Sequence, residues 1–309
     1  MSWLDRQSFL GVDSDAVFAG LTVGLVGLGG GNSHVVQQLA HLGVGGFVLA
    51  DDDIITLTNL NRLVGGTLQD VKDGRAKVDI SERVIRAINP KARIAALPEK
   101  WQLVGDALKR CDIIIGGVDN VGAKDELEAF CRRFMIPYID MGMDVHRIEE
   151  TGEYLVAGQV ILSSPGTPCL RCLGVVTEAA LETEAKAYGD AGSKPQVVWP
   201  NGVLASTAVG LLVQLLSPWH RAPVRSAYLV YDANLGTVAP SDRLRRRWET
   251  PCPHYPPRAV GDPSFDIRGF LEMTERPVAA PPPEPVRREG WWARLAAPFR
   301  RRRGHAAHR

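Results

Sequence analysis

A run of glycines between an apolar strand pattern and a helical pattern constrains this chain more than any other feature. The run is Gly27-Leu28-Gly29-Gly30-Gly31-Asn32, preceded by apolar residues 21–26 and followed by a helical pattern that starts at Ser33. Glycines let backbone N–H groups approach a phosphate, and the N-terminus of a helix favours its negative charge. The pattern therefore predicts a phosphate-binding turn in a strand–turn–helix unit.

Three consecutive acids follow the next apolar run. Residues 46–50 form that run, and Asp51, Asp52 and Asp53 come directly after it. Asp51 lies 24 residues after Gly27, a separation at which a carboxylate can bond the ribose hydroxyls of a nucleotide. Taken alone, the turn and the acid fit a dehydrogenase as well as other nucleotide-binding proteins.

Strand and helix patterns alternate along the first half of the chain. We expect strands at residues 21–26, 46–50, 92–96, 112–116 and 137–140, and helices at residues 33–42, 75–88, 103–109 and 123–134. This alternation predicts a Rossmann-like α/β fold, with a mainly parallel sheet and helices on both faces. Strand patterns at residues 154–162 and 228–232, with a buried apolar helix at residues 203–216, predict an extension of the sheet by antiparallel strands.

The sequence divides into a long folded part and a short tail. The folded part is expected to span residues 1–260, and its polar, glycine-containing stretch at about 177–200 predicts a mobile crossover segment. Residues 277–309 hold a proline-rich linker and then interleaved tryptophans and arginines, which we expect to be disordered. Such a tail can touch an acidic partner or an anionic membrane surface.

Composition sets limits on location and partners. The 309 residues carry a net charge of +1, so the bulk of the chain gives no electrostatic argument for nucleic acid. We find no charged-then-apolar leader at the start and no apolar run of about 18 residues that could span a bilayer. Five cysteines in such a chain suggest a reducing compartment, so we expect a cytoplasmic protein.

A second group of polar residues follows the acids. Asn59 and Arg62 come first, Lys77 stands 15 residues after Arg62, and Asp119 stands at the carboxyl end of an expected strand. Because ligands bind at that edge of open α/β sheets, the four side chains can converge on the glycine turn. Two cations and an amide near phosphates, with a carboxylate that can hold magnesium, suit a triphosphate better than a dinucleotide.

With these residues in place, the sequence resembles the ThiF/MoeB/HesA family, the bacterial relatives of ubiquitin-activating enzymes. The resemblance covers roughly residues 3–260 and keeps the family's order. The residues that carry it are the glycine turn, Asp51 and Asp53, Asn59-Leu60-Asn61-Arg62, Gly74 and Lys77 leading to Asn89-Pro90, Asp119-Asn120, the N-terminal Arg6-Gln7, and the pair Cys169 and Cys172.

The resemblance implies an adenylyltransferase that uses ATP and Mg²⁺. In the family's reaction, the C-terminal glycine carboxylate of a small ubiquitin-like protein attacks the α-phosphate of ATP, which gives an acyl-adenylate and pyrophosphate. Catalysis of such a step is mostly positioning and neutralisation of phosphate charge. The implied catalytic residues are Arg62, Lys77, Asp119 as the magnesium ligand, and Arg6, which reaches into the partner's site of a homodimer. The implied cofactor-binding residues are Gly27, Gly29, Gly30, Gly31, Asp51 at the ribose, Asp53, Asn59 at the phosphates, and Asn120.

Several of these residues also have an ordinary structural explanation. Asp51 can cap a turn, and Asn59 and Arg62 can form a solvated pair on one helix face. Lys77 can be a surface residue of an amphipathic helix, and Asp119-Asn120 can cap the helix that follows. Asn32 stands where the family more usually has glycine; asparagine tolerates unusual backbone angles and can cap a helix.

Four residues are expected to form a structural zinc site. Cys169 and Cys172 resemble the family's first zinc half-site, but the family's second Cys-x-x-Cys pair is absent. Cys252 and His254 offer two further ligands, with Cys252 80 residues beyond Cys172, so a Cys₃His site is predicted. The alternatives are a fourth ligand from elsewhere in the chain, or a metal-free turn with buried cysteines.

The crossover segment lacks the cysteine that thioester-forming or persulfide-forming relatives carry there. Cys111 begins an expected buried strand and Cys131 lies on an expected helix behind the sheet, so we expect both to be inert apolar residues. The sequence therefore favours adenylation without an enzyme thioester. If the zinc site is wrong, Cys169 or Cys172 returns as a candidate nucleophile.

The setting of the reaction stays open between two pathways. Sulfur transfer for cofactor synthesis would need a separate sulfur donor, and a bacterial ubiquitin-like conjugation pathway would need a downstream conjugating enzyme. One competing function is activation of a carboxylate on modified tRNA, although the only dense basic run we find is the tail. The other is a non-catalytic scaffold, against which Arg62, Lys77 and Asp119 all argue.

Overall fold

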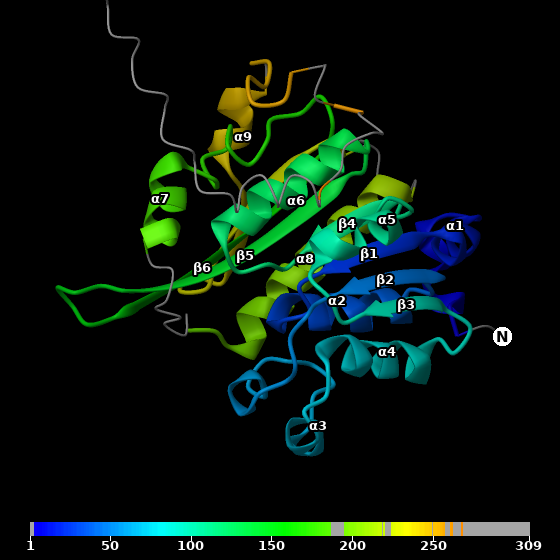
Figure 1. The fold of residues 1–309 in the computed structure, drawn as a ribbon. Helices are drawn as coiled ribbons and strands as arrows, with labels where there is room; N and C mark the ends of the chain where they lie inside the picture. Colours follow the sequence, from blue (N-terminus) through cyan, green and yellow to red (C-terminus); the bar gives the residue numbers. More distant parts are fainter. Residues whose placement is uncertain are drawn as a thin grey trace, which may run out of the picture. The chain divides into compact units, whose positions relative to one another are not determined.

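An eight-stranded mixed sheet organises the protein in the order β3-β2-β1-β4-β5-β6-β7-β8 (Figure 1). The structure, a computed structural model, describes residues 3–186, 195–217, 219, 224–248, 250–256, 260, 261 and 267. Contacts within the chain separate Met1–Gly269 from Phe270–Arg309, and the second unit, with the expected tail at 277–309, lies outside the described residues.

Five strands form the parallel half of the sheet, as the sequence predicted. They are β1 (Thr22–Val26), β2 (Gly46–Ala50), β3 (Arg93–Leu97), β4 (Ile113–Gly116) and β5 (Tyr138–Arg147). β1 lies in the middle and pairs in parallel with β2 and β4. Strands covered on both faces read as continuous apolar runs, which is why residues 46–50 and 113–116 gave clear signals.

β5 joins the parallel half to an antiparallel half. Its first residues pair with β4 in parallel, and its whole length pairs with β6 (Tyr154–Ser163) in antiparallel register. β7 (Ala227–Asp232) and β8 (Thr237–Pro240) complete the sheet in antiparallel order. β5 therefore runs seven residues beyond its expected end at Asp140, and β8, whose four residues are all exposed, was not predicted because it carries no apolar pattern.

Helices cover both faces of the sheet, which confirms the expected architecture. The α-helices are α1 (Ser14–Gly20), α2 (Gly30–His41), α3 (Leu68–Asp73), α4 (Lys77–Ile88), α5 (Gly105–Leu108), α6 (Val121–Arg133), α7 (Glu178–Lys186), α8 (Val198–Leu216) and α9 (Asp242–Arg247), and the 3-10 turns are η1 (Asp5–Leu10), η2 (Leu57–Asn59) and η3 (Trp101–Val104). α2 packs between α4 and α8 on one face, while α6 contacts β4 and β5 from the other (Figure 1).

α8 corrects one expectation from the sequence. It begins five residues earlier than expected, and its 19 residues, with a mean hydropathy of 1.3, are long and apolar enough to cross a membrane by length and composition. Half of this stretch is buried, because α8 packs against α2, β5 and β6, and Leu204, Ala208 and Leu212 belong to the main core. Such burial is typical of a core helix. The length and hydropathy of α8 are therefore only weak evidence for a membrane span.

Two other elements differ from the sequence pattern. α2 begins at Gly30, three residues before the expected start, so Gly30 and Gly31 form the first helical turn. The crossover segment, expected to be mobile throughout, contains the nine-residue helix α7, while residues 187–194 lie outside the described residues. In α2 the two glycines weakened the helix signal, whereas α7 consists mostly of strong helix formers, so its propensity for a helix was present in the sequence and was missed.

Candidate nucleotide site and metal centre

The glycine turn lies between the end of β1 and the start of α2, at the carboxyl edge of the parallel strands. Gly27 has a φ of +75°, and a Cβ added to it would lie 3.0 Å from the Gly117 carbonyl group after β4. A Cβ added to Gly29 would meet nothing within 4 Å. The backbone conformation at position 27 thus requires glycine. Gly29 leaves open space beside the N-terminus of the twelve-residue helix α2, where a phosphate is favoured.

Asn32 fastens this turn to two strands. It is fully buried, and its Nδ2 donates to the carbonyl oxygens of Val26, Gly27 and Ile115 at 3.1, 2.9 and 3.2 Å. A Cβ on Gly117 would lie 3.0 Å from this nitrogen, so Gly117 leaves the room that the amide fills. Because Asn32 lies inside α2, the idea that it caps the helix is wrong; it stabilises the turn from within.

Asp51, at the end of β2, holds the turn from the other side. Its Oδ2 accepts from the Leu28 N–H at 2.5 Å and its Oδ1 accepts from the Asp53 N–H at 2.9 Å. Burial raises the pKa of this carboxyl, while the Lys77 ammonium and the two backbone donors oppose that shift. The turn-fixing role that we left open for Asp51 is therefore present, in a residue that also lines the cavity described below.

Lys77 is a buried residue of the site. It begins α4, its side chain is only 9% exposed, and its Nζ lies 2.5 Å from Asp53 Oδ2 and 3.8 Å from Asp51 Oδ1. The alternative of a surface lysine on an amphipathic helix is wrong, because α4 turns this first position toward the strand ends. Lys77 and Asp53 form an ion pair at the edge of the cavity.

A cavity of about 360 Å³ lies over the strand ends and the turn. It is lined by these predicted residues: Gly27, Gly29, Asp51, Asp53, Lys77, Asp119 and Asn120. The sequence reasoning missed three further lining residues, Lys100, Trp101 and Gln102, which lie just beyond β3 and at the start of η3. Their position directly after a parallel strand was the available signal, since that edge of the sheet binds ligands.

A second cavity of about 330 Å³ adjoins the first. Gly30, Gly31 and residues of β5, β6 and α8 line it, and both cavities share Gly117, Val118 and Asp119. Asp119 therefore lies between two compartments. Its neighbour Asn120 is the N-cap of α6 and accepts from the Ala123 N–H at 2.6 Å, so the capping explanation holds for Asn120.

Asn59 and Arg62 lie outside the described lining of both cavities. Asn59 Oδ1 accepts from the Thr56 N–H at 2.9 Å in a reciprocal cap of η2. Arg62 donates to the Thr58 carbonyl at 2.7 Å, and its Cδ is 3.3 Å from where a Cβ on Gly30 would lie. Arg62 is thus beside the helix N-terminus, whereas Asn59 has a local structural task.

Arg6 is far from this chain's own glycine turn. It lies exposed on η1, and its neighbour Gln7 donates to the Leu42 carbonyl at 3.2 Å, just past the opposite end of α2. A role for Arg6 in catalysis therefore needs a second copy of the chain, and it stays a prediction.

The described ends of the crossover segment bond to loops at the ligand edge. Glu184 on α7 accepts from the N–H groups of Val121 and Gly122, the first residues of α6, at 3.0 and 2.9 Å. Asn61 Nδ2 donates to the Gln196 carbonyl at 2.8 Å. One end is therefore tied next to Asp119 and the other next to Arg62.

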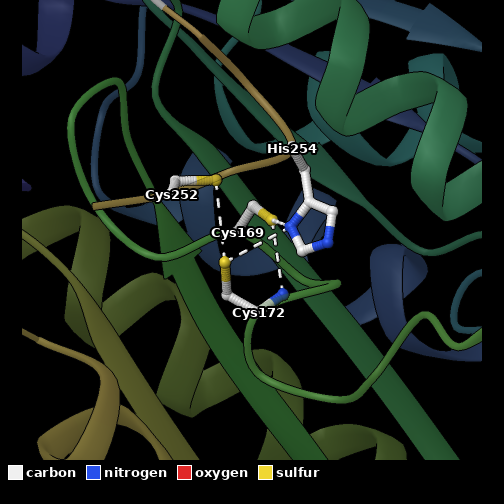
Figure 2. Close-up of side chains that lie close together, drawn as sticks. All are labelled: Cys169, Cys172, Cys252 and His254. Atoms are coloured by element: carbon white, nitrogen blue, oxygen red, sulfur yellow. Dashed lines mark hydrogen bonds between the residues drawn. The ribbon is translucent and has the colours of Figure 1, made fainter. Parts of the chain in front are cut away.

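Cys169, Cys172, Cys252 and His254 converge as the sequence predicted, and Figure 2 shows the three sulfurs on the side of the imidazole ring that carries Nδ1. His254 Nδ1 lies 3.3 Å from Cys169 Sγ and 3.4 Å from Cys172 Sγ, and Cys172 Sγ lies 3.6 Å from Cys252 Sγ. A tetrahedral zinc ion with bonds of about 2.0–2.3 Å needs ligand separations of about 3.5–3.8 Å. The donor set and its spacing fit zinc.

Side chains of α6 hold the cluster. Arg171, between the two cysteines, makes two 2.7 Å hydrogen bonds to Asp125, and the buried Glu128 accepts from the Leu170 N–H at 3.0 Å. Arg132 stacks over the Tyr255 ring at 5.0 Å. Because α6 begins directly after Asp119-Asn120, one helix connects the Cys/His cluster to the shared edge of the two cavities.

Cys111 and Cys131 are buried, as expected. Burial raises the pKa of the Cys111 thiol to about 12, and it raises the pKa of the fully buried Cys131 thiol as well. Neither thiol forms the thiolate that a nucleophile needs near neutral pH.

Comparison with family models matches residues 6–253 to the ThiF family. The chain is 35% identical to the sulfur carrier protein ThiS adenylyltransferase of Escherichia coli (strain K12) over 37% of this chain and 46% of that protein. It is 31% identical to the tRNA threonylcarbamoyladenosine dehydratase of the same organism over 44% and 51% of the two chains. The matches span about half the length of these two relatives. The match to the E. coli molybdopterin-synthase adenylyltransferase is longer, 30% identical over 68% of this chain and 78% of that protein.

The same fold occurs in a solved structure. The crystal structure of E. coli MccB with succinimide superposes with a TM-score of 0.64 at 20% sequence identity, covering 78% of this chain and 71% of that one. At this level of identity the likeness establishes the fold, and the chemistry has to be argued from the residues of the site.

Proposed function

The chain belongs to the ThiF family, and from that premise we propose that it is an adenylyltransferase. It uses ATP to activate the C-terminal glycine carboxylate of a small ubiquitin-like protein, releasing pyrophosphate. A relative that carries the name adenylyltransferase and the matching residues of the nucleotide edge both support this proposal.

One observation carries the proposal: Asp119 lines two adjoining cavities. The first cavity has the glycine turn, a buried lysine and an acid after β2, which suits a nucleotide. The second is lined by β5, β6 and α8 and suits the end of an extended peptide. A carboxylate held in the second cavity can meet the α-phosphate at their common edge, and positioning of this kind supplies much of the catalysis.

Residues of the nucleotide cavity would bind and neutralise the triphosphate. The N-terminus of α2 and the open space over Gly29 favour a phosphate, and Lys77 and Arg62 supply positive charge on either side. Asp119 would hold Mg²⁺, which supplies further charge neutralisation on phosphates. Cys169, Cys172, Cys252 and His254 would hold Zn²⁺ as a structural ion, outside the chemical step.

The proposed reaction has no enzyme thioester. Two of the five cysteines are buried with raised pKa, the other three lie in the Cys/His cluster, and residues 187–194 contain none. The activated acyl group would pass directly to a separate acceptor. The protein would act in the cytoplasm as a homodimer. Arg6 of each copy would then complete the site of the other copy.

ATP–pyrophosphate exchange tests the proposal. The purified protein should catalyse exchange only when a ubiquitin-like protein that ends in glycine is present, and a non-reducing gel should show no thiol-sensitive adduct. Exchange with such an adduct would restore a catalytic cysteine. Absence of exchange with a full panel of glycine-terminated ubiquitin-like proteins would contradict the proposal.

A second candidate is activation of a carboxylate on modified tRNA, which the similarity to a tRNA-modifying relative favours. The expectation that the tail is the only dense basic run is wrong, because α9 carries Arg243, Arg245, Arg246 and Arg247. Three of these arginines line a 500 Å³ cavity beside Cys172. Exchange or AMP formation that depends on tRNA, and weakens steeply with salt, would identify this function.

A further inference from the structure

The second cavity contains one cation. Among its described lining residues, the charged ones are Asp119, Asp144 and Lys124. A peptide carboxylate that enters this cavity is repelled by both aspartates, and Lys124, which shares its charge with the buried Asp140, is the cation of the described lining that can attract it. The charge pattern therefore points to Lys124 as the residue that receives an anion.

Lys124 is held rigidly in this position. It lies on α6 with a side chain only 8% exposed, and its Nζ donates to Asp140 Oδ1 at 2.6 Å and to the Met141 carbonyl at 2.8 Å. An ammonium group has three N–H donors, so these two bonds leave one for a ligand. A side chain fixed before binding loses little conformational entropy when the ligand arrives.

Gln159 brings a second donor to the same space. It is paired directly with Gly142 across β5 and β6, and it also lines the cavity. A Cβ added to Gly142 would lie 2.6 Å from Gln159 Nε2 and 3.5 Å from Lys124 Nζ. Gly142 does not have a positive φ, so its backbone does not require glycine. The Gln159 amide therefore occupies the room that a side chain at position 142 would need, and it lies beside the Lys124 ammonium.

We propose that Lys124 and Gln159 bind the α-carboxylate of the substrate's C-terminal residue in the second cavity, which Asp119 also lines. This inference rests on the proposed function and names the residues that hold the acyl group for adenylation. The pair recognises charge: a carboxylate accepts from both donors, whereas a C-terminal amide brings its own N–H groups toward them.

A pair of peptides tests the inference: a synthetic octapeptide ending in Gly-Gly with a free carboxylate, and the same peptide as its C-terminal amide. Binding to the full-length protein is measured by calorimetry. We expect the wild type to prefer the acid by about tenfold or more. Gln159→Glu places a negative charge beside the ligand and should abolish this preference, as should Lys124→Met. Lys124→Arg keeps the charge and should retain it.

Two variants guard against misinterpretation. Lys124→Met leaves the buried Asp140 without its counter-ion and can fail to fold, whereas Gln159 is half-exposed and its replacement spares that pair. Gln69→Glu makes the same charge change on the exposed surface of α3 and should behave as the wild type. Equal binding of the two peptides by the wild type, no detectable binding of the acid, or an unchanged preference in Gln159→Glu would each overturn the inference.

The outcome is separable from that of the proposed function. Binding of a non-hydrolysable ATP analogue should be the same in wild type and Gln159→Glu, because Gln159 does not line the nucleotide cavity. Exchange activity without any acid preference would refute the inference and leave the adenylyltransferase standing. A protein without exchange activity could still prefer the acid and lose this preference in Gln159→Glu. That result would support the inference and contradict the adenylyltransferase.

Discussion

The parallel and antiparallel halves of the sheet assemble their sites in different ways. In the parallel half, the glycine turn, Asp51 and Asp119 follow strand ends and Lys77 begins α4 beside them, so the topology of the backbone brings them together. In the antiparallel half, the Cys/His cluster joins segments 80 residues apart and depends on side chains of α6 for its position. The first half should therefore tolerate loss of a functional side chain without unfolding, and the second should not.

The largest expected effect is loss of chemistry without loss of fold. Asp119→Asn should reduce ATP–pyrophosphate exchange by about 10³-fold, because the lost carboxylate is the residue at the common edge of the two cavities. Its melting temperature should stay close to that of the wild type. Asp79→Asn, an exposed acid on α4, is the matched control and should retain full exchange. An Asp119→Asn variant that retains full exchange would show that the Asp119 carboxylate is not needed for the chemical step.

The next effect is the opposite, loss of fold without direct loss of chemistry. Cys252→Ser should lower the melting temperature by about 10 °C or more, since a structural metal site contributes folding energy directly. Exchange by the folded fraction at low temperature should fall only a fewfold. A chelator should destabilise the wild type and leave the variant unchanged, and elemental analysis of the wild type should find one zinc per chain. A wild type without bound metal would refute the zinc site.

Asparagines in the two halves sharpen the comparison. Asn32→Ala should cost about 2–3 kcal/mol of unfolding free energy, because a buried amide bonded to three carbonyl groups is lost. Asn234→Ala removes an exposed amide that bonds Val156 and Tyr154 in the antiparallel half, and should cost about 1 kcal/mol or less. Denaturant unfolding measures both. Equal costs would mean that Asn32 does not secure the turn.

The coupling energy of one contact between the cluster and α6 can be measured directly. Arg171 and Asp125 form a two-point ion pair with side chains 27% and 22% exposed, so a double-mutant cycle with alanine should give a coupling of about 1 kcal/mol. A coupling near zero would mean that this ion pair does not help to hold the cluster.

The smallest expected effect is a loss of stability at acidic pH. It concerns Asp70 on α3, in the parallel half. Two hydrogen bonds from Arg83 hold the pKa of Asp70 well below its ordinary value of about 4. Because the folded-state pKa is depressed, this stabilisation is present above pH 4 and is lost as the pH falls further. Asp70→Asn should be less stable than the wild type at pH 7, and the difference should shrink toward pH 2. A constant difference would exclude the charge of Asp70 as its cause.

How far the sequence could predict the molecule follows the same division. The runs at residues 46–50 and 113–116 are covered on both faces, so their apolar patterns were sufficient to place β2 and β4. The four residues of the Cys/His cluster were predictable because few residue types bind zinc. Lys100, Trp101 and Gln102 had only their position shortly after β3 as a signal, and residues of many types share such a position. The bonds of Glu184 to α6 and of Asn61 to Gln196 depend on tertiary packing, which no local pattern records.

The spacing of the cluster ligands also sets an order of events during synthesis. Cys169 and Cys172 leave the ribosome long before Cys252 and His254, and the intervening chain contains α7, α8, β7, β8 and α9. Strands β1 to β5 are all synthesised before Cys169 and Cys172. The parallel half can therefore form before the Cys/His cluster is complete. Once closed, a metal bridge would join the ends of an 80-residue loop and remove about 4–5 kcal/mol of chain entropy from the unfolded state, by analogy with a covalent cross-link. Cys252 and His254 would then stabilise a domain whose nucleotide-binding edge has already folded.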